Sequence, residues 1–186
     1  MKKILCLATL LTLPISLIHA QTPSAAPAPA SPPASVATAT VGPNLAGTWN
    51  LNLAKSDYDQ VPPPSSEILT LTQTGSAFTS ATASDNERGK EVYTLPFTTD
   101  GTETPTPKGT FSDTATLQYL STKAEWKGAS LVVTQKILYE AAPGTLKSTF
   151  TLSADGKTLT RAMHISVDQG EFDTTAVFEK QSSPHP

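Results

Sequence analysis

The side chains that could perform chemistry in this chain of 186 residues are few. The sequence has three histidines, a single cysteine, and no Gly-x-Ser-x-Gly, phosphate-loop or dinucleotide-binding motif. His164 is the only histidine away from the chain ends, and it alternates with Met163 and Ile165, which places it on the polar side of a strand. A lone imidazole that faces solvent is typical of a surface residue and cannot complete a transition-metal site. These residues predict no enzyme, no metal site and no cofactor.

Two acidic clusters offer oxygen atoms, at Asp57-Tyr58-Asp59 and Asp85-Asn86-Glu87. Neither cluster has the spacing or the glycine of a calcium loop. Paired carboxylates could also hydrolyse glycosides, but that chemistry needs an aromatic cleft for the sugar. The chain has only two tryptophans, Trp49 and Trp126, and we expect Trp126 to fill one end of the fold. Solvated turns are therefore the expected role of both clusters.

The N-terminal segment Met1–Ala20 has the pattern of a secretory signal peptide. Lys2 and Lys3 precede the apolar run Ile4–Ile18, which is shorter than the roughly 20 residues that span a bilayer. Cys6 lies at the start of this run, where it cannot become a lipoprotein cysteine, and it would leave with the signal. We expect a secreted or periplasmic protein with no stable membrane anchor after cleavage.

The remaining chain divides into three parts by composition. Residues 21–43 are rich in Pro, Ala, Ser and Thr and lack large apolar side chains, which predicts a disordered linker. Residues 44–181 are enough for one domain with an ordinary core, and residues 182–186 are expected to form a disordered tail. The net charge of −3 argues against nucleic-acid binding, which requires a basic surface. We expect the domain to be a monomer.

Almost every segment within residues 44–181 alternates apolar and polar residues, as half-buried strands do. Asp155-Gly156 is the strongest hairpin signal, and Lys127-Gly128, Pro143-Gly144 and Gln169-Gly170 indicate further turns. The Thr-Pro repeat over 104–107 predicts a loop. We predict an all-β fold, an antiparallel up-and-down barrel of about 8–10 strands, with a β-sandwich as the alternative.

Two short motifs resemble a known superfamily. The segment Leu45–Leu51, with the Gly-x-Trp of Gly47 and Trp49, is similar to the first strand of the lipocalins and fatty-acid-binding proteins, the calycins. Thr175–Lys180 resembles the last strand of the fatty-acid-binding proteins. Uncharacterised secreted bacterial lipocalin-like domains show the same opening and an Asp-Gly-Lys hairpin. The resemblance implies a lipocalin-like barrel.

The sequence also departs from that superfamily. Fatty-acid-binding proteins hold a carboxylate with an Arg and a Tyr on the last strand, and the matching positions here are Ala176 and Phe178. Those proteins carry a two-helix lid after the first strand, whereas Lys55–Ser66 is short and contains three consecutive prolines. The lipocalin motif Thr-Asp-Tyr is reduced to Thr99-Asp100-Gly101. The resemblance therefore implies the barrel but not this carboxylate clamp.

The charged residue of most interest is Arg161. In lipocalins an Arg from a late strand packs over the motif Trp, and Arg161 shares a strand side with Leu159 and Met163, which points it inward. An inward Arg is costly unless it is paired or stacked. We expect Arg161 to stack on Trp49, or alternatively to bind an anionic group of a ligand. A β-bulge that turns it outward is the remaining alternative.

The predicted function is that of an exported, non-enzymatic protein that holds a small apolar or amphipathic molecule inside the barrel. The expected lining consists of Trp49, Leu117, Tyr119, Phe150, Arg161, Met163, Phe172 and Phe178. Small barrels are often filled by their own side chains, so the alternative is a structural or surface-interaction domain with a filled core. An enzyme that encloses its substrate, such as an isomerase, is a third hypothesis. The volume of the interior distinguishes the first two.

Overall fold

A computed structural model describes residues 42–87, 89–112 and 115–182. The predicted signal peptide, the linker up to residue 41 and the tail from residue 183 lie outside the described residues. In the described part, no helix is long and apolar enough to cross a membrane. The elements are β1 (Gly47–Leu51), η1 (Leu53–Lys55, a 3-10 helix), β2 (Ser66–Thr74), β3 (Ala77–Asn86), β4 (Gly89–Thr98), β5 (Asp100–Pro105), β6 (Leu117–Lys127), β7 (Ser130–Tyr139), β8 (Ala142–Leu152), β9 (Thr158–Val167) and β10 (Gly170–Lys180).

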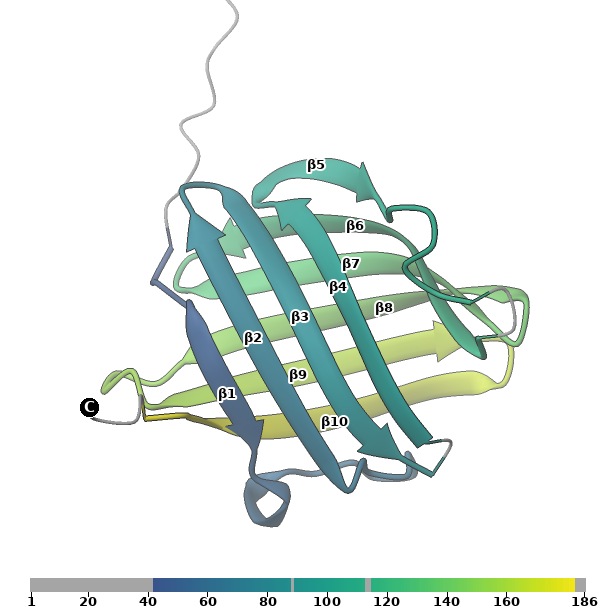
Figure 1. Cartoon of the computed structure of the whole chain (residues 1–186), viewed down its shortest axis with the longest axis horizontal. Helices are drawn as coiled ribbons and strands as arrows, with labels where there is room; N and C mark the ends of the chain where they lie inside the picture. Colours follow the sequence, from purple (N-terminus) through teal and green to yellow (C-terminus); the bar gives the residue numbers. More distant parts are fainter. Residues whose placement is uncertain (1–41, 88, 113–114, 183–186) are drawn as a thin grey trace, which may run out of the picture. The chain divides into compact units, whose positions relative to one another are not determined.

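The ten strands form one antiparallel sheet in the order β4-β3-β2-β1-β10-β9-β8-β7-β6-β5. Strand β1 pairs with both β2 and β10, so the first and last strands lie side by side. In Figure 1, β1–β4 form one wall of the barrel and β6–β10 cross behind them as the other. The two ends of the sheet order, β4 and β5, meet at a seam. This arrangement confirms the predicted up-and-down barrel and excludes the β-sandwich.

Alternation of side chains decides which face of each strand is buried. In β2, Glu67, Leu69 and Leu71 are buried, while the intervening Ile68 remains 44% exposed on the outer face. A period of two also applies within β6, but a register shift between Tyr119 and Ser121 changes which residues of that strand face inward. One face of the sheet therefore forms the interior of the barrel.

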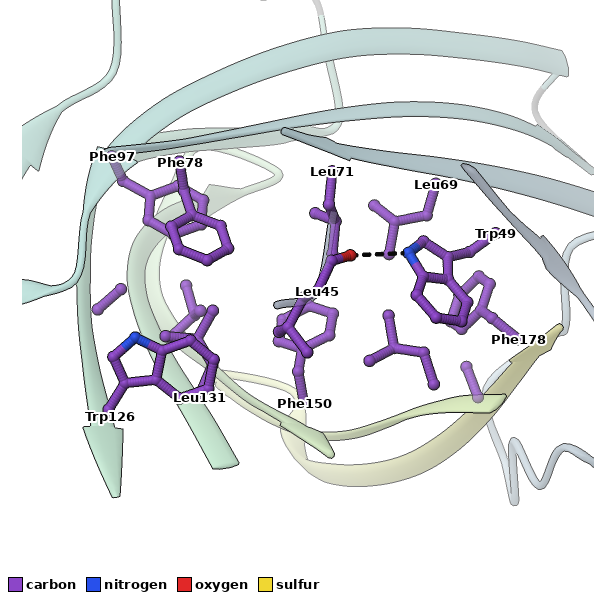
Figure 2. Packing of buried hydrophobic residues seen from close by; sticks show 14 residues of the cluster. Leu45, Trp49, Leu69, Leu71, Phe78, Phe97, Trp126, Leu131, Phe150 and Phe178 are labelled. Atoms are coloured by element: carbon purple, nitrogen blue, oxygen red, sulfur yellow. Dashed lines mark hydrogen bonds between the residues drawn. The ribbon is translucent and has the colours of Figure 1, made fainter. Parts of the chain in front are cut away.

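The packed core fills the end of the barrel where Trp49 lies (Figure 2). Trp49 is fully buried, and its Nε1 donates a hydrogen bond of 3.0 Å to the carbonyl oxygen of Leu45. Phe78 stacks on Phe97 with 5.6 Å between ring centroids and meets Trp126 edge-on at 6.2 Å. Gly42 lies so close to the Trp126 indole that a Cβ on Gly42 would overlap the ring. Trp126 therefore packs at one end of the barrel, as expected.

Three of the predicted turn signals lie at connections between consecutive strands, namely Lys127-Gly128, Asp155-Gly156 and Gln169-Gly170, and the fourth, Pro143-Gly144, is wrong. At the β8–β9 turn, the Gly156 amide donates to Ser153 O at 2.9 Å and Gly156 has a φ of 68°. Pro143-Gly144, in contrast, lies within β8, and the chain reverses three residues earlier, at Glu140-Ala141. A Cβ on Gly144 would lie 2.8 Å from the carbonyl oxygen of Ser166, so this glycine allows β9 to approach and does not form a turn.

The predicted loop over residues 104–107 is also partly wrong, because β5 extends to Pro105. Pro105 is tolerated there since β5 is an edge strand that hydrogen-bonds only to β6, and proline cannot donate to a second neighbour. Between β1 and β2 the structure has only the short η1 and an irregular segment, in place of a two-helix lid.

Candidate binding site

A cavity of about 430 Å³ opens at the end of the barrel opposite the packed core. Its wall comes from the later residues of β3, β7 and β9 and the earlier residues of β2, β4, β6, β8 and β10. Segment 56–65, which connects η1 to β2, adds Tyr58, Val61 and Pro64 to this wall. Most of the other wall side chains are aliphatic or aromatic, among them Leu117, Ile137, Leu146, Ile165, Val167 and Phe172.

A smaller cavity of about 50 Å³ lies further inside the barrel. It shares Tyr93, Tyr119, Arg161 and Met163 with the larger cavity, and its other wall residues include Phe150. The interior is therefore hollow at one end, narrow at the middle and filled at the other end.

An ion pair between Arg161 and Glu67 lies where the two cavities meet. Nη1 and Nη2 of Arg161 donate hydrogen bonds of 2.8 and 3.0 Å to the two carboxylate oxygens of Glu67. The side chains are 13% and 6% exposed, respectively. Burial by itself lowers the pKa of Arg161, but the charge and hydrogen bonds of Glu67 outweigh burial and raise this pKa. The guanidinium of Arg161 therefore stays charged and lies against the carboxylate of Glu67.

The predicted stacking of Arg161 on Trp49 is wrong. Arg161 lies over the ring of Phe178, 5.1 Å from its centroid, while Lys180 Nζ lies 5.1 Å from the Trp49 ring. Strand register explains the difference, because Arg161 is opposite Ala176 in β10 and Trp49 is opposite Lys180. The inward orientation of Arg161 was predicted correctly, but Lys180 takes the expected place at the tryptophan.

Two tyrosines line the inner wall near the seam, and Phe111 packs against both of them. The hydroxyls of Tyr93 and Tyr119 are 3.3 Å apart, and Phe111 packs 5.4 Å from each ring. Burial raises the pKa of Tyr93, and burial together with Tyr93 raises the pKa of Tyr119 well above its ordinary value. Both phenols therefore remain neutral over the physiological pH range.

The structure divides the eight predicted lining residues into three groups. Leu117, Tyr119, Arg161, Met163 and Phe172 lie on the wall of the larger cavity. Phe150 lies on the wall of the smaller one. Trp49 and Phe178 contact neither cavity and belong to the packed core, because their strands place them at the filled end. A role in ligand binding stays a prediction for the first two groups.

Sequence reasoning missed Glu67, although its signal was present. Glu67 precedes Leu69 and Leu71 by two and four residues in β2, so the alternation that buries the leucines also points Glu67 inward. Tyr58 had no comparable signal, since it lies in an irregular segment. The backbone bridge between Asp57 and Thr175 holds this segment against β10 and positions Tyr58 on the cavity wall.

Both acidic clusters lie partly on this wall, and not solely in solvated turns as predicted. Tyr58 belongs to the first cluster, and Asn86 and Glu87 belong to the second. His164 is on the outer face, where its Nδ1 lies 2.9 Å from a carboxylate oxygen of Asp173. Within the described ranges, no three His, Cys, Asp or Glu side chains are grouped so that they could hold a metal ion.

No protein-family model and no curated protein matches this chain. Among solved structures, it is similar to the zebrafish ileal bile acid-binding protein complexed with cholic acid, with a TM-score of 0.50 and 16% identity over 74% of this chain and 98% of the other. It is also similar to a Schistosoma mansoni fatty acid binding protein in complex with arachidonic acid, with a TM-score of 0.47 and 14% identity over 74% and 96%. The likeness to the zebrafish protein concerns the fold, an antiparallel β-barrel.

Proposed function

We propose that this protein binds a small apolar or amphipathic molecule in the larger cavity and performs no reaction on it. The observation that carries the proposal is the cavity itself, since about 430 Å³ is within the range of roughly 300–1,000 Å³ typical of small-molecule sites. Its wall is mostly apolar, with a few polar groups near Arg161, as such sites usually are. A structural domain with a filled core is less well supported, because only one end of the barrel is filled.

Two further observations support the proposal. The zebrafish protein of similar fold holds cholic acid, which is an amphipathic molecule. The N-terminal sequence of this chain, with Lys2 and Lys3 before an apolar run, supports export, and we propose that the binding protein acts outside the cytoplasm.

The direct test is native mass spectrometry of the protein purified from its own host without refolding. A retained small molecule is the expected result. In parallel, an uncharged fluorescent apolar probe such as N-phenyl-1-naphthylamine, or an uncharged polyene chain, is titrated into the purified protein. The absence of both a retained molecule and probe binding would show that the cavity is not a binding site.

Two neighbouring residues of β9 provide a matched pair of variants. Met163 faces both cavities, whereas Ala162 is exposed on the outer face. Met163→Trp fills part of the interior and should weaken binding of a polyene probe about tenfold or more. Ala162→Trp adds the same ring outside and should leave the affinity unchanged. Equal affinities in the two variants would contradict binding in the cavity.

A further inference from the structure

Arg161 lies on the cavity wall, and its positive charge is already paired with the carboxylate of Glu67. Glu67 accepts a hydrogen bond from each of the two terminal nitrogens of the guanidinium, and both side chains are largely buried. A carboxylate of a ligand could reach the guanidinium only by displacing Glu67 or by lying beside it. In a poorly solvated site, a second negative charge next to the first is strongly unfavourable.

The other charged residues described on the wall are Glu87 and Glu91. Both are exposed, so they lie where the cavity meets solvent. Together with Glu67, they give the described wall three carboxylates against the single guanidinium of Arg161. An approaching anion therefore meets negative charge at the opening and no unpaired cation on the described part of the wall.

Two polar groups of the wall are left for a neutral partner. Arg161 Nε and the Tyr58 hydroxyl are buried and make no well-formed hydrogen bond with the described residues, although Arg161 lies close enough to the hydroxyl to oppose the rise in its pKa that burial causes. Nε can only donate, while the hydroxyl can donate and accept. Burial raises the pKa of Tyr58, so its hydroxyl stays neutral. A hydroxyl or carbonyl oxygen of a ligand could accept hydrogen bonds from this region without bringing a charge, and buried groups without partners cost free energy.

We propose that the cavity selects an uncharged amphiphile, such as a long-chain alcohol or ester, over the corresponding carboxylate. This inference rests on the proposed function, because it names the class of ligand for the same cavity. Glu67 takes the place beside Arg161 that an anionic head group would otherwise occupy. The apolar chain then lies against the aliphatic and aromatic wall, with its hydroxyl or carbonyl end toward Arg161 and Tyr58.

The experiment compares two fluorescent probes that differ only at one end, cis-parinaric acid and cis-parinaryl alcohol. Each is titrated at pH 8 into the full-length protein and into two variants. Glu67→Gln removes the counter-charge of Arg161 and keeps a side chain of the same size. Glu171→Gln is the matched control, because Glu171 is exposed in β10 and lies on neither cavity wall. Thermal unfolding of each variant verifies that it is folded.

The wild-type protein should bind the alcohol about tenfold or more tightly than the carboxylate. In Glu67→Gln the affinity for the carboxylate should rise about tenfold or more, while that for the alcohol changes little. Glu171→Gln should bind both probes as the wild type does. If Glu67→Gln fails to fold, the comparison of the two probes with the wild-type protein decides by itself.

The outcomes separate this inference from the proposed function. If the wild type binds both probes and prefers the carboxylate or shows no preference, the selection of an uncharged ligand is wrong and the binding function stands. If Glu67→Gln folds and keeps the wild-type preference, Glu67 is not the cause and the inference fails. If the wild type binds neither probe and retains no molecule from its host, the proposed function itself is overturned.

Discussion

Glu67 and Arg161 are 94 residues apart in the chain, yet they form the ion pair beneath the cavity. Two parallel hydrogen bonds between a guanidinium and a carboxylate are strong and directional. Both groups lose hydration on burial, however, so such a pair adds little net stability compared with apolar side chains of similar volume. Loss of one partner has a much larger effect, because an uncompensated charge stays in the interior.

At this scale we expect Glu67→Ala to lower the free energy of unfolding by about 3–5 kcal/mol. The double variant Glu67→Leu/Arg161→Met removes both charges while keeping the volume filled, and it should recover most of that loss. Equilibrium unfolding in urea measures both effects. A double variant that is less stable than the single one would show that the pair itself is strongly stabilising.

The turns illustrate how strand pairing imposes conformations on elements. In the β7–β8 hairpin, Glu140 and Ala141 have φ values of 51° and 67°, a left-handed region that both residue types disfavour. Tyr139 pairs with Ala142 directly across this two-residue turn. The turn is therefore of the kind that Asn-Gly usually forms, and the strands enforce it on less suitable residues.

Replacing Glu140→Asn and Ala141→Gly together should increase the free energy of unfolding by about 1 kcal/mol, because the backbone strain is relieved. Thermal or urea unfolding provides the measurement. A control change of Lys127→Asn, next to a turn that already has Gly128 with a φ of 62°, should have little effect. If the double variant is less stable than the wild-type protein, the backbone of this turn is not strained.

The β8–β9 hairpin has a pH-sensitive turn. An oxygen of Asp155 accepts hydrogen bonds from Ser153 Oγ at 2.6 Å and from the Lys157 amide at 3.0 Å. The Ser153 hydroxyl and the Lys157 amide lower the pKa of Asp155 from its ordinary value of 3.8. Because the folded-state pKa is depressed, the stabilisation is present above the ordinary value and is lost as the pH falls through the folded-state pKa.

Asp155→Ala should therefore melt at a lower temperature than the wild type at pH 7. The difference between the two proteins should shrink as the pH falls below 3.8, where the wild-type carboxylate becomes protonated. Thermal unfolding followed by circular dichroism at several pH values checks this expectation. A difference independent of pH would show that the carboxylate charge does not stabilise the turn.

At the scale of the whole barrel, the packed core fills one end and the larger cavity opens at the other. We therefore expect substitutions at the first end to affect stability and those at the second to affect binding. Strand β9 runs through both, since Leu159 is fully buried in the packed core and Ile165 lies on the wall of the larger cavity. Removal of a core side chain loses its transfer free energy and leaves a new void. At the cavity wall, the neighbouring space is already open, so fewer contacts are lost.

Leu159→Ala should lower the free energy of unfolding by about 2–5 kcal/mol. Ile165→Ala, a comparable deletion in the same strand, should cost less than half of that and should weaken probe binding several-fold. Urea unfolding and probe titration on both variants measure the contrast. Equal losses of stability would contradict the division of the interior into a packed and a hollow end.

The local sequence determined which faces of the strands are buried, and with them the fold class. Alternation is read from neighbouring residues, so it correctly predicted an antiparallel barrel, the Asp155-Gly156 hairpin and an inward Arg161. The same alternation also points Glu67 inward, on the side of Leu69 and Leu71.

Only the tertiary structure decided which of these residues meet. The partner of Arg161, the place of Lys180 at Trp49 and the shift of the β7–β8 turn to Glu140 and Ala141 all depend on strand register. The position and size of the cavity depend on how side chains from eight strands and one irregular segment fill a shared volume. Neither the pairing of these residues nor the cavity can be read from the local sequence, because both arise from contacts between residues far apart in the chain.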